Sequence, residues 1–109
     1  MESHIEEKSK IEEETRKILH LTLTKKWFDM IYSGIKKEEY REIKEYWDKR
    51  LSKEYDIIKF VNGYGSDRPT ILIECLGIEI GKGNTEWGGG DEDVYIIKLG
   101  EILEKDYTV

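Results

Sequence analysis

With 109 residues, the chain fits one compact domain with a single core. Its net charge of -6 argues against a general nucleic-acid coating protein, because such binding depends on basic residues that displace counterions from phosphates. Hydrophobic residues make up 38% and charged residues 39%, which argues against a disordered chain and predicts a small core under a heavily solvated surface.

The first predicted element is a helical extension over residues 1–17. Within residues 4–17, acidic residues stand four positions before basic ones, and each such pair supports a helix by ~0.3 kcal/mol. The pairs are Glu6 with Lys10, Glu12 with Arg16, and Glu13 with Lys17. Isoleucines are too few here to bury the helix well, so we expect it to be peripheral and without a catalytic role.

The domain proper is expected at residues 18–109 and begins with a strand and a helix. Leucines alternate with polar residues over Leu19–Leu23, which is the period of a half-buried strand. Thr24 is suited to be the N-cap of a helix from Lys25 to Ser33, and Gly34 provides the C-terminal stop.

Three further strands are predicted in the second half of the chain. They cover Asp56–Asn62, Ile71–Ile80 and Val94–Leu103, which are rich in β-branched and apolar residues. Strands separated by two short helices indicate a small closed sheet of the α+β class.

Residues 34–41 crowd both signs of charge around one aromatic residue, directly after the first predicted helix. They read Gly-Ile-Lys-Lys-Glu-Glu-Tyr-Arg and fit the pattern Gly-x-Lys-x-x-Glu-x-Arg at Gly34, Lys36, Glu39 and Arg41. This pattern resembles the signature of the ASCH family, the activating-signal-cointegrator homology domains, whose small barrel resembles the RNA-binding PUA domain. The resemblance implies a small PUA-like β-barrel of about five to six strands with two short helices and a cleft beside the first helix.

Residues 38–51 carry conflicting signals. Apolar side chains recur there with helical spacing, at Tyr40, Ile43, Trp47 and Leu51, and this periodicity favours one helix. The ASCH resemblance implies instead that the signature runs into a strand. We therefore expect a strand near residues 36–42 and a helix from about Lys44 to Leu51.

The motif supplies the main candidate site. A lysine in a partly desolvated cleft acts as a base, a nucleophile or an anion clamp, so Lys36 is a candidate for each role. Glu39 and Arg41 share one face of a strand, where Arg41 can orient Glu39 or grip a phosphate. Lys36 joins them only if it lies in the turn before the strand. A solvated lysine and a surface ion pair are the alternative interpretations.

Some ASCH enzymes hydrolyse acetylated cytidine with the motif lysine, a threonine and a glutamate, and ribonuclease activity also occurs in the family. The threonine of the first group falls where this chain has Glu39. A carboxylate there is expected to raise the pKa of Lys36 and weaken it as a nucleophile. This departure favours recognition over hydrolysis.

A glycine-rich loop at residues 81–88 is the second candidate region. Trp87 offers a stacking face for a base, and Glu86 is a candidate general base. Tyr64, between two glycines, is a further stacking candidate. The alternatives are a plain hairpin with Trp87 covering one end of the barrel, and a surface tyrosine.

The sequence therefore predicts recognition of RNA or a modified nucleoside, and leaves open whether the protein is an enzyme. The ligand-binding candidates are Lys36, Glu39, Tyr40, Arg41, Tyr64 and Trp87; in an enzyme the catalytic candidates are Lys36, Glu39 and Glu86. A hydrolase, or a protein-interaction module that uses the acidic segment 63–109, is the alternative.

Residue usage sets the remaining expectations. A single cysteine, Cys75, forms no internal disulfide, and two histidines supply no Cys/His set for zinc. We therefore expect no metal, no cofactor and a reducing, cytoplasmic location. No apolar run approaches the ~20 residues of a membrane span, so we expect no membrane partner.

Overall fold

The computed structural model describes residues 16–63 and 68–107. The predicted N-terminal helix lies outside the described residues except for Arg16 and Lys17, which are not helical. Tyr64 also lies outside them. Among the described residues, no helix is long and apolar enough to cross a membrane.

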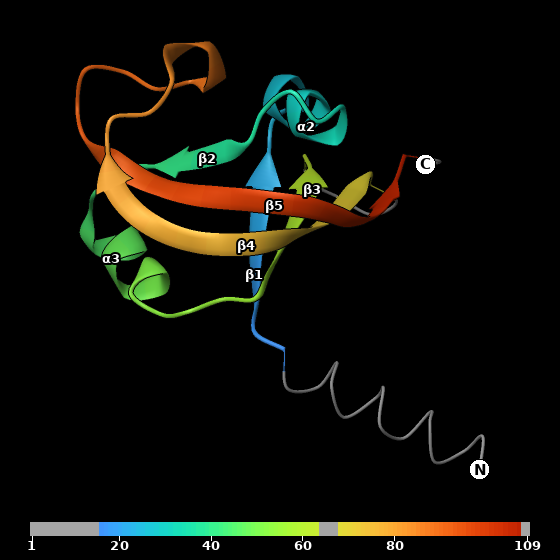
Figure 1. Cartoon of the computed structure of the whole chain (residues 1–109), viewed down its shortest axis with the longest axis horizontal. Helices are drawn as coiled ribbons and strands as arrows, with labels where there is room; N and C mark the ends of the chain where they lie inside the picture. Colours follow the sequence, from blue (N-terminus) through green and yellow to red (C-terminus); the bar gives the residue numbers. More distant parts are fainter. Residues whose placement is uncertain (1–15, 64–67, 108–109) are drawn as a thin grey trace.

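The described residues form five strands, two helices and one short 3-10 turn (Figure 1). In chain order these are β1 (Ile18–Leu23), α2 (Lys25–Tyr32), β2 (Glu38–Arg41), α3 (Glu45–Leu51), β3 (Ile57–Asn62), β4 (Thr70–Gly81), η1 (Thr85–Trp87) and β5 (Val94–Asp106). This confirms the α+β class and the alternation of strands with two short helices.

The five strands form one sheet in the order β1-β3-β4-β5-β2. β1 pairs with β3 in parallel, and the other neighbours are antiparallel. The long strands β4 and β5 curve together, so the sheet curls into a half-barrel (Figure 1). Register shifts between Leu72 and Gly77 of β4 mark bulges, which bend a strand and increase its twist. The sheet edges are β1 and β2.

The core fills the inside of this curl. The leucines of β1 point inward as their alternation predicts, and α2 adds Phe28 and Ile31. Burying one such side chain stabilises the fold by about 1.5–3 kcal/mol. The core cluster consists of Leu19, Leu21, Leu23, Phe28, Ile31, Leu51, Ile58, Phe60, Ile71, Ile73, Ile97 and Leu99.

Periodicity favours one helix over residues 38–51, and this prediction is wrong. Glu38–Arg41 instead pairs antiparallel with β5, where Glu39 lies opposite Ile97 and Arg41 opposite Tyr95. Pairing with a long neighbouring strand satisfies the backbone here, so tertiary contact overrides local periodicity. The helix α3 runs from Glu45 to Leu51, close to the expected helix from about Lys44 to Leu51.

Candidate functional site

The turn between α2 and β2 brings the motif together. Gly34 has φ 84°, which glycine adopts without strain, and it ends the helix as predicted. The amides of Ile35 and Lys36 both donate to the carbonyl of Met30, so the chain folds back over the last turn of α2. Lys36 therefore lies in the turn before β2, which is the condition for it to meet Glu39.

Lys36 is almost completely buried, with 2% of its surface exposed. Its Nζ donates to the carbonyl oxygen of Trp87 at 2.7 Å and lies 3.2 Å from Oε1 of Glu39. The ring centroids of Trp27 and Tyr40 lie 5.0 and 4.8 Å from Nζ, within cation–π range. The interpretation of Lys36 as a solvated lysine is therefore wrong.

Glu39 lies between two cations. Its Oε1 faces Lys36, its Oε2 accepts a hydrogen bond from the Nη1 of Arg41, and 3% of the residue is exposed. Arg41 also donates to the carbonyls of Tyr40 and Thr22, at 3.0 and 3.3 Å, and stacks over Trp47. The three side chains form one cluster, in which Lys36 and Glu39 are buried and Arg41 is partly exposed, here called the Lys36–Glu39–Arg41 triad.

The pKa of Lys36 lies below its ordinary value of 10.5. Burial is the largest cause, because desolvation disfavours the ammonium. Glu39 acts in the opposite direction but does not offset it, and Arg41 adds to the lowering. Glu39 therefore acts on the pKa of Lys36 in the expected direction, but burial outweighs it and the net shift is downward.

A hollow of about 120 Å³ opens onto the triad. Besides the triad it is lined by Trp27, Tyr40, Trp87 and Gly88. Sequence reasoning missed Trp27, because its position in a helix of apolar residues indicates a core side chain. The one signal in the sequence is its place in the helix that leads directly into the motif.

The glycine-rich loop before β5 supplies part of the wall of this hollow, at Trp87 and Gly88. The amide of Asn84 donates to the hydroxyl of Tyr40 at 2.8 Å, and the Tyr40 ring leaves no space for a side chain at Gly83. Gly88 has φ 101° and packs against Trp27. A β-carbon on Gly89 would lie 2.3 Å from the backbone of Gly83. The glycines thus let the backbone at Gly83 and Gly89 come close together, and this close approach is here called the neck of the loop. The neck places the Trp87 carbonyl next to Lys36.

The hydroxyl group of Tyr40 is held by two hydrogen bonds. Its hydroxyl donates to Oε1 of Glu38 at 2.7 Å, besides accepting from Asn84. Burial and the neighbouring carboxylate of Glu38 raise the pKa of Tyr40 to about 12. The phenol therefore stays neutral at physiological pH and acts as a wall of the hollow.

The predicted site residues divide into two groups. Lys36, Glu39, Tyr40, Arg41 and Trp87 meet at the hollow. The candidate general base Glu86 does not line it: the side chain is exposed, while its amide is capped by Asn84. Among residues 16–63 and 68–107, no three His, Cys, Asp or Glu side chains are placed to hold a metal ion.

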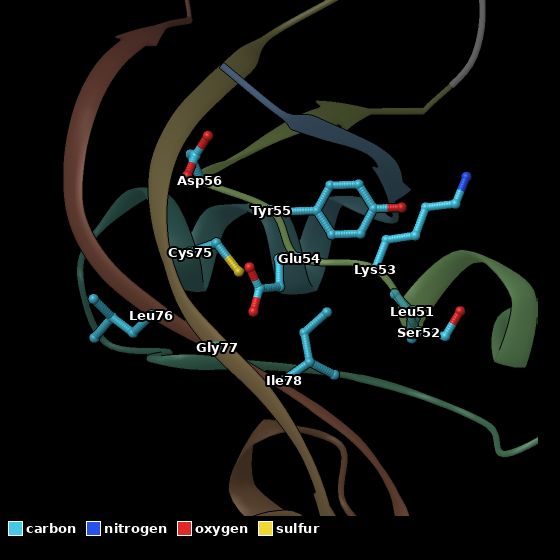
Figure 2. A pocket seen from close by; sticks show the side chains of 10 residues that line it. All are labelled: Leu51, Ser52, Lys53, Glu54, Tyr55, Asp56, Cys75, Leu76, Gly77 and Ile78. Atoms are coloured by element: carbon cyan, nitrogen blue, oxygen red, sulfur yellow. The ribbon is translucent and has the colours of Figure 1, made fainter. Parts of the chain in front are cut away.

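A larger hollow of about 480 Å³ lies elsewhere, between the segment after α3 and the bulge of β4 (Figure 2). The side chains of Glu54 and Cys75 point toward each other in it, while Lys53 points away (Figure 2). Burial raises the pKa of the Cys75 thiol, which keeps it protonated and a poor nucleophile. No buried charge lines this hollow, so the smaller one with the triad is the better candidate.

Comparison of the chain with protein-family models, with curated proteins and with solved structures gives no match in any of the three.

Proposed function

We propose that this protein is an ASCH-type, PUA-like domain that recognises RNA or a modified nucleoside through the hollow over the Lys36–Glu39–Arg41 triad. The observation that carries the proposal is a buried ammonium next to a nearly buried carboxylate in an aromatic-walled hollow. The signature that suggests the family is also the sequence that forms this cluster.

Stability alone is a poor reason for such a cluster. Removing two charges from water costs several kcal/mol for each ion, and apolar residues of similar volume often stabilise a fold as well or better. Charged groups with perturbed pKa values in a hollow are instead typical of functional sites. Lys36 meets this description, since burial lowers its pKa.

The chemistry of the hollow suits a nucleobase. Lys36 and Arg41 place two sets of charged N–H donors beside the hollow, so ligand oxygens find hydrogen-bond partners there. Trp27, Tyr40 and Trp87 provide aromatic faces, on which bases stack in single-stranded recognition. A long basic groove is not needed for such a local site.

Binding by Lys36→Met and Lys37→Met variants tests the proposal. Lys37 is the matched control, because it is the next residue in the chain and its side chain is exposed. Nucleosides and short single-stranded RNAs are titrated by NMR, at low salt and again at physiological salt. We expect Lys36→Met to abolish the shifts around the hollow and Lys37→Met to preserve them.

The salt series separates the two forms of ligand. A nucleoside whose affinity is insensitive to salt indicates a pocket ligand, whereas an RNA whose affinity falls with salt indicates contacts to phosphates. Absence of binding by every nucleoside and RNA would contradict the proposal. So would binding that survives loss of Lys36.

A hydrolase of the same fold is the second candidate, and the lowered pKa of Lys36 favours it. A larger neutral fraction makes a lysine a better nucleophile or base. Turnover of acetylcytidine, or cleavage of RNA, that disappears in Lys36→Met but not in Lys37→Met would support this candidate. Binding without turnover supports recognition.

A further inference from the structure

The order of charged groups in the triad points to the edge of the ring that the hollow accepts. Glu39 lies in the middle, with one oxygen facing Lys36 and the other facing Arg41. Lys36 and Arg41 are donors only, and an ionised glutamate is an acceptor only. The three charged side chains that line the hollow are therefore, in order, a donor, an acceptor and a donor.

Each member of the triad has hydrogen-bonding capacity to spare. An ammonium has more N–H groups than the two acceptors found for Lys36 among the described residues, Trp87 and Glu39, occupy. The guanidinium of Arg41 likewise has N–H groups beyond those bound to Glu39, Tyr40 and Thr22. A carboxylate accepts at more positions than the two that Glu39 uses. All three side chains line the hollow.

The hollow is also small. Its volume of about 120 Å³ lies below the ~300 Å³ at which pockets for drug-sized ligands begin. A single six-membered ring fits this space better than a two-ring purine. The aromatic walls favour a flat ring over a tetrahedral phosphate group.

We propose that the hollow selects a pyrimidine ring with an imide edge, which is the uracil type, an inference that rests on the proposed function. The carbonyl, N–H and carbonyl of this edge are an acceptor, a donor and an acceptor. They complement Lys36, Glu39 and Arg41 in order. Cytosine presents an amino group, a ring nitrogen and a carbonyl, so it matches at one position only. A site whose buried polar groups are left unpaired by the wrong ligand rejects that ligand strongly.

Titration of the unmodified protein with uridine, cytidine and 3-methyluridine tests this inference. The methyl group of 3-methyluridine removes the N–H that faces Glu39 and leaves both carbonyls and the stacking face. We expect uridine to bind at least roughly tenfold more tightly than either of the others, because one lost hydrogen bond that leaves a buried partner costs about that factor. Short oligouridylate and oligocytidylate repeat the comparison for single-stranded RNA.

The outcomes distinguish this inference from the proposed function. Equal affinity for the three nucleosides would overturn edge recognition and leave nucleoside recognition intact, because stacking alone does not discriminate among them. Tighter binding of cytidine would also overturn it. Absence of binding by all nucleosides and RNAs would remove the proposed function together with this inference. In a Glu39→Gln variant the side-chain amide adds a donor in the middle position, so the preference for uridine over cytidine should shrink.

Discussion

The guanidinium of Arg41 donates a hydrogen bond of 3.3 Å to the main-chain carbonyl oxygen of Thr22. Arg41 belongs to β2 and Thr22 to β1, which are the two edge strands of the sheet. One side chain thus joins the two edges of the half-barrel, and the same side chain holds Glu39. The site and the closure of the sheet depend on a common residue.

Replacement of Arg41 by lysine should destabilise the fold although it preserves the charge. A lysine lacks the planar fork that reaches Glu39, Tyr40 and Thr22 together. We expect the free energy of unfolding to fall by about 1–3 kcal/mol, because the buried carboxylate of Glu39 and two main-chain carbonyls lose a donor. Urea unfolding measures the change. Arg50→Lys is the control, since Arg50 is exposed, and equal midpoints for the two variants would contradict the prediction.

Lys36 should make stability depend on pH in the alkaline range. Its folded-state pKa is lowered, so between that pKa and 10.5 the unfolded chain holds a proton that the folded chain has lost. Stability contributed by this group therefore rises with pH through that window. Below the lowered pKa both states are protonated, and burial of the charge lowers stability by a constant amount.

The free energies of unfolding of the unmodified protein and of Lys36→Met, at about pH 8 and about pH 10, measure this effect. The unmodified protein should gain stability relative to Lys36→Met as the pH rises. Tyr40 also makes stability depend on pH near pH 10, because its pKa is raised to about 12 in the folded protein, but both proteins carry Tyr40, so its contribution cancels in the difference between them. Lys37→Met, at the exposed neighbouring position, is the control. Loss of stability by the unmodified protein relative to Lys36→Met as the pH rises would contradict the assigned direction.

The neck of the glycine-rich loop should not tolerate a methyl group at Gly89. A β-carbon there would lie 2.3 Å from the backbone of Gly83, which cannot move aside as a flexible side chain can. We expect Gly89→Ala to lower the free energy of unfolding by about 1–3 kcal/mol, or to displace the loop and with it the Trp87 carbonyl from Lys36.

Gly90→Ala is the matched control for the loop. No atom lies within 4 Å of a β-carbon at Gly90, so this change should stay within about 0.5 kcal/mol of the unmodified protein. Thermal unfolding gives the stability, and NMR shifts of the Lys36 and Trp87 amides report the position of the loop. Indistinguishable stability and shifts for the two variants would show that the neck is open in solution.

Cys75 should react slowly with thiol reagents in the folded protein. Burial raises the pKa of its thiol, and only the thiolate is nucleophilic. At about pH 8 we expect a disulfide reagent to modify the native protein more slowly than the urea-unfolded chain. The chain has one cysteine, so the absorbance change reports this site alone. Equal rates in the two states would exclude a protected thiol.

Predictions for the fold succeeded where local pattern and tertiary packing agree. The alternating leucines of β1 gave a strand because every second side chain enters the core. Gly34 gave the end of α2 because its φ of 84° suits glycine. Periodicity alone failed at Tyr40, since pairing of β2 with β5 decided the backbone there. Only the family resemblance indicated the strand.

Predictions for the site were mixed for a similar reason. From the motif spacing we expected Lys36 to meet Glu39 only if Lys36 lies in the turn before the strand. Lys36 does lie in that turn, and the two side chains meet. Nothing local indicated that Trp27 would lie against Lys36, or that Glu86 would be exposed and outside the lining of the hollow. Those outcomes depend on how the loop before β5 packs against Tyr40 of β2 and Trp27 of α2.

The sequence by itself determined the order of the elements and the identity of the three charged groups, because alternation, glycine positions and the spacing of the motif act over short distances along the chain. Only the tertiary structure decided that Lys36 is buried and that its pKa is lowered. Its nearest hydrogen-bond partner, the Trp87 carbonyl, is 51 positions away in the chain. Desolvation is a property of the assembled surroundings, so it arises only when distant segments close over the side chain.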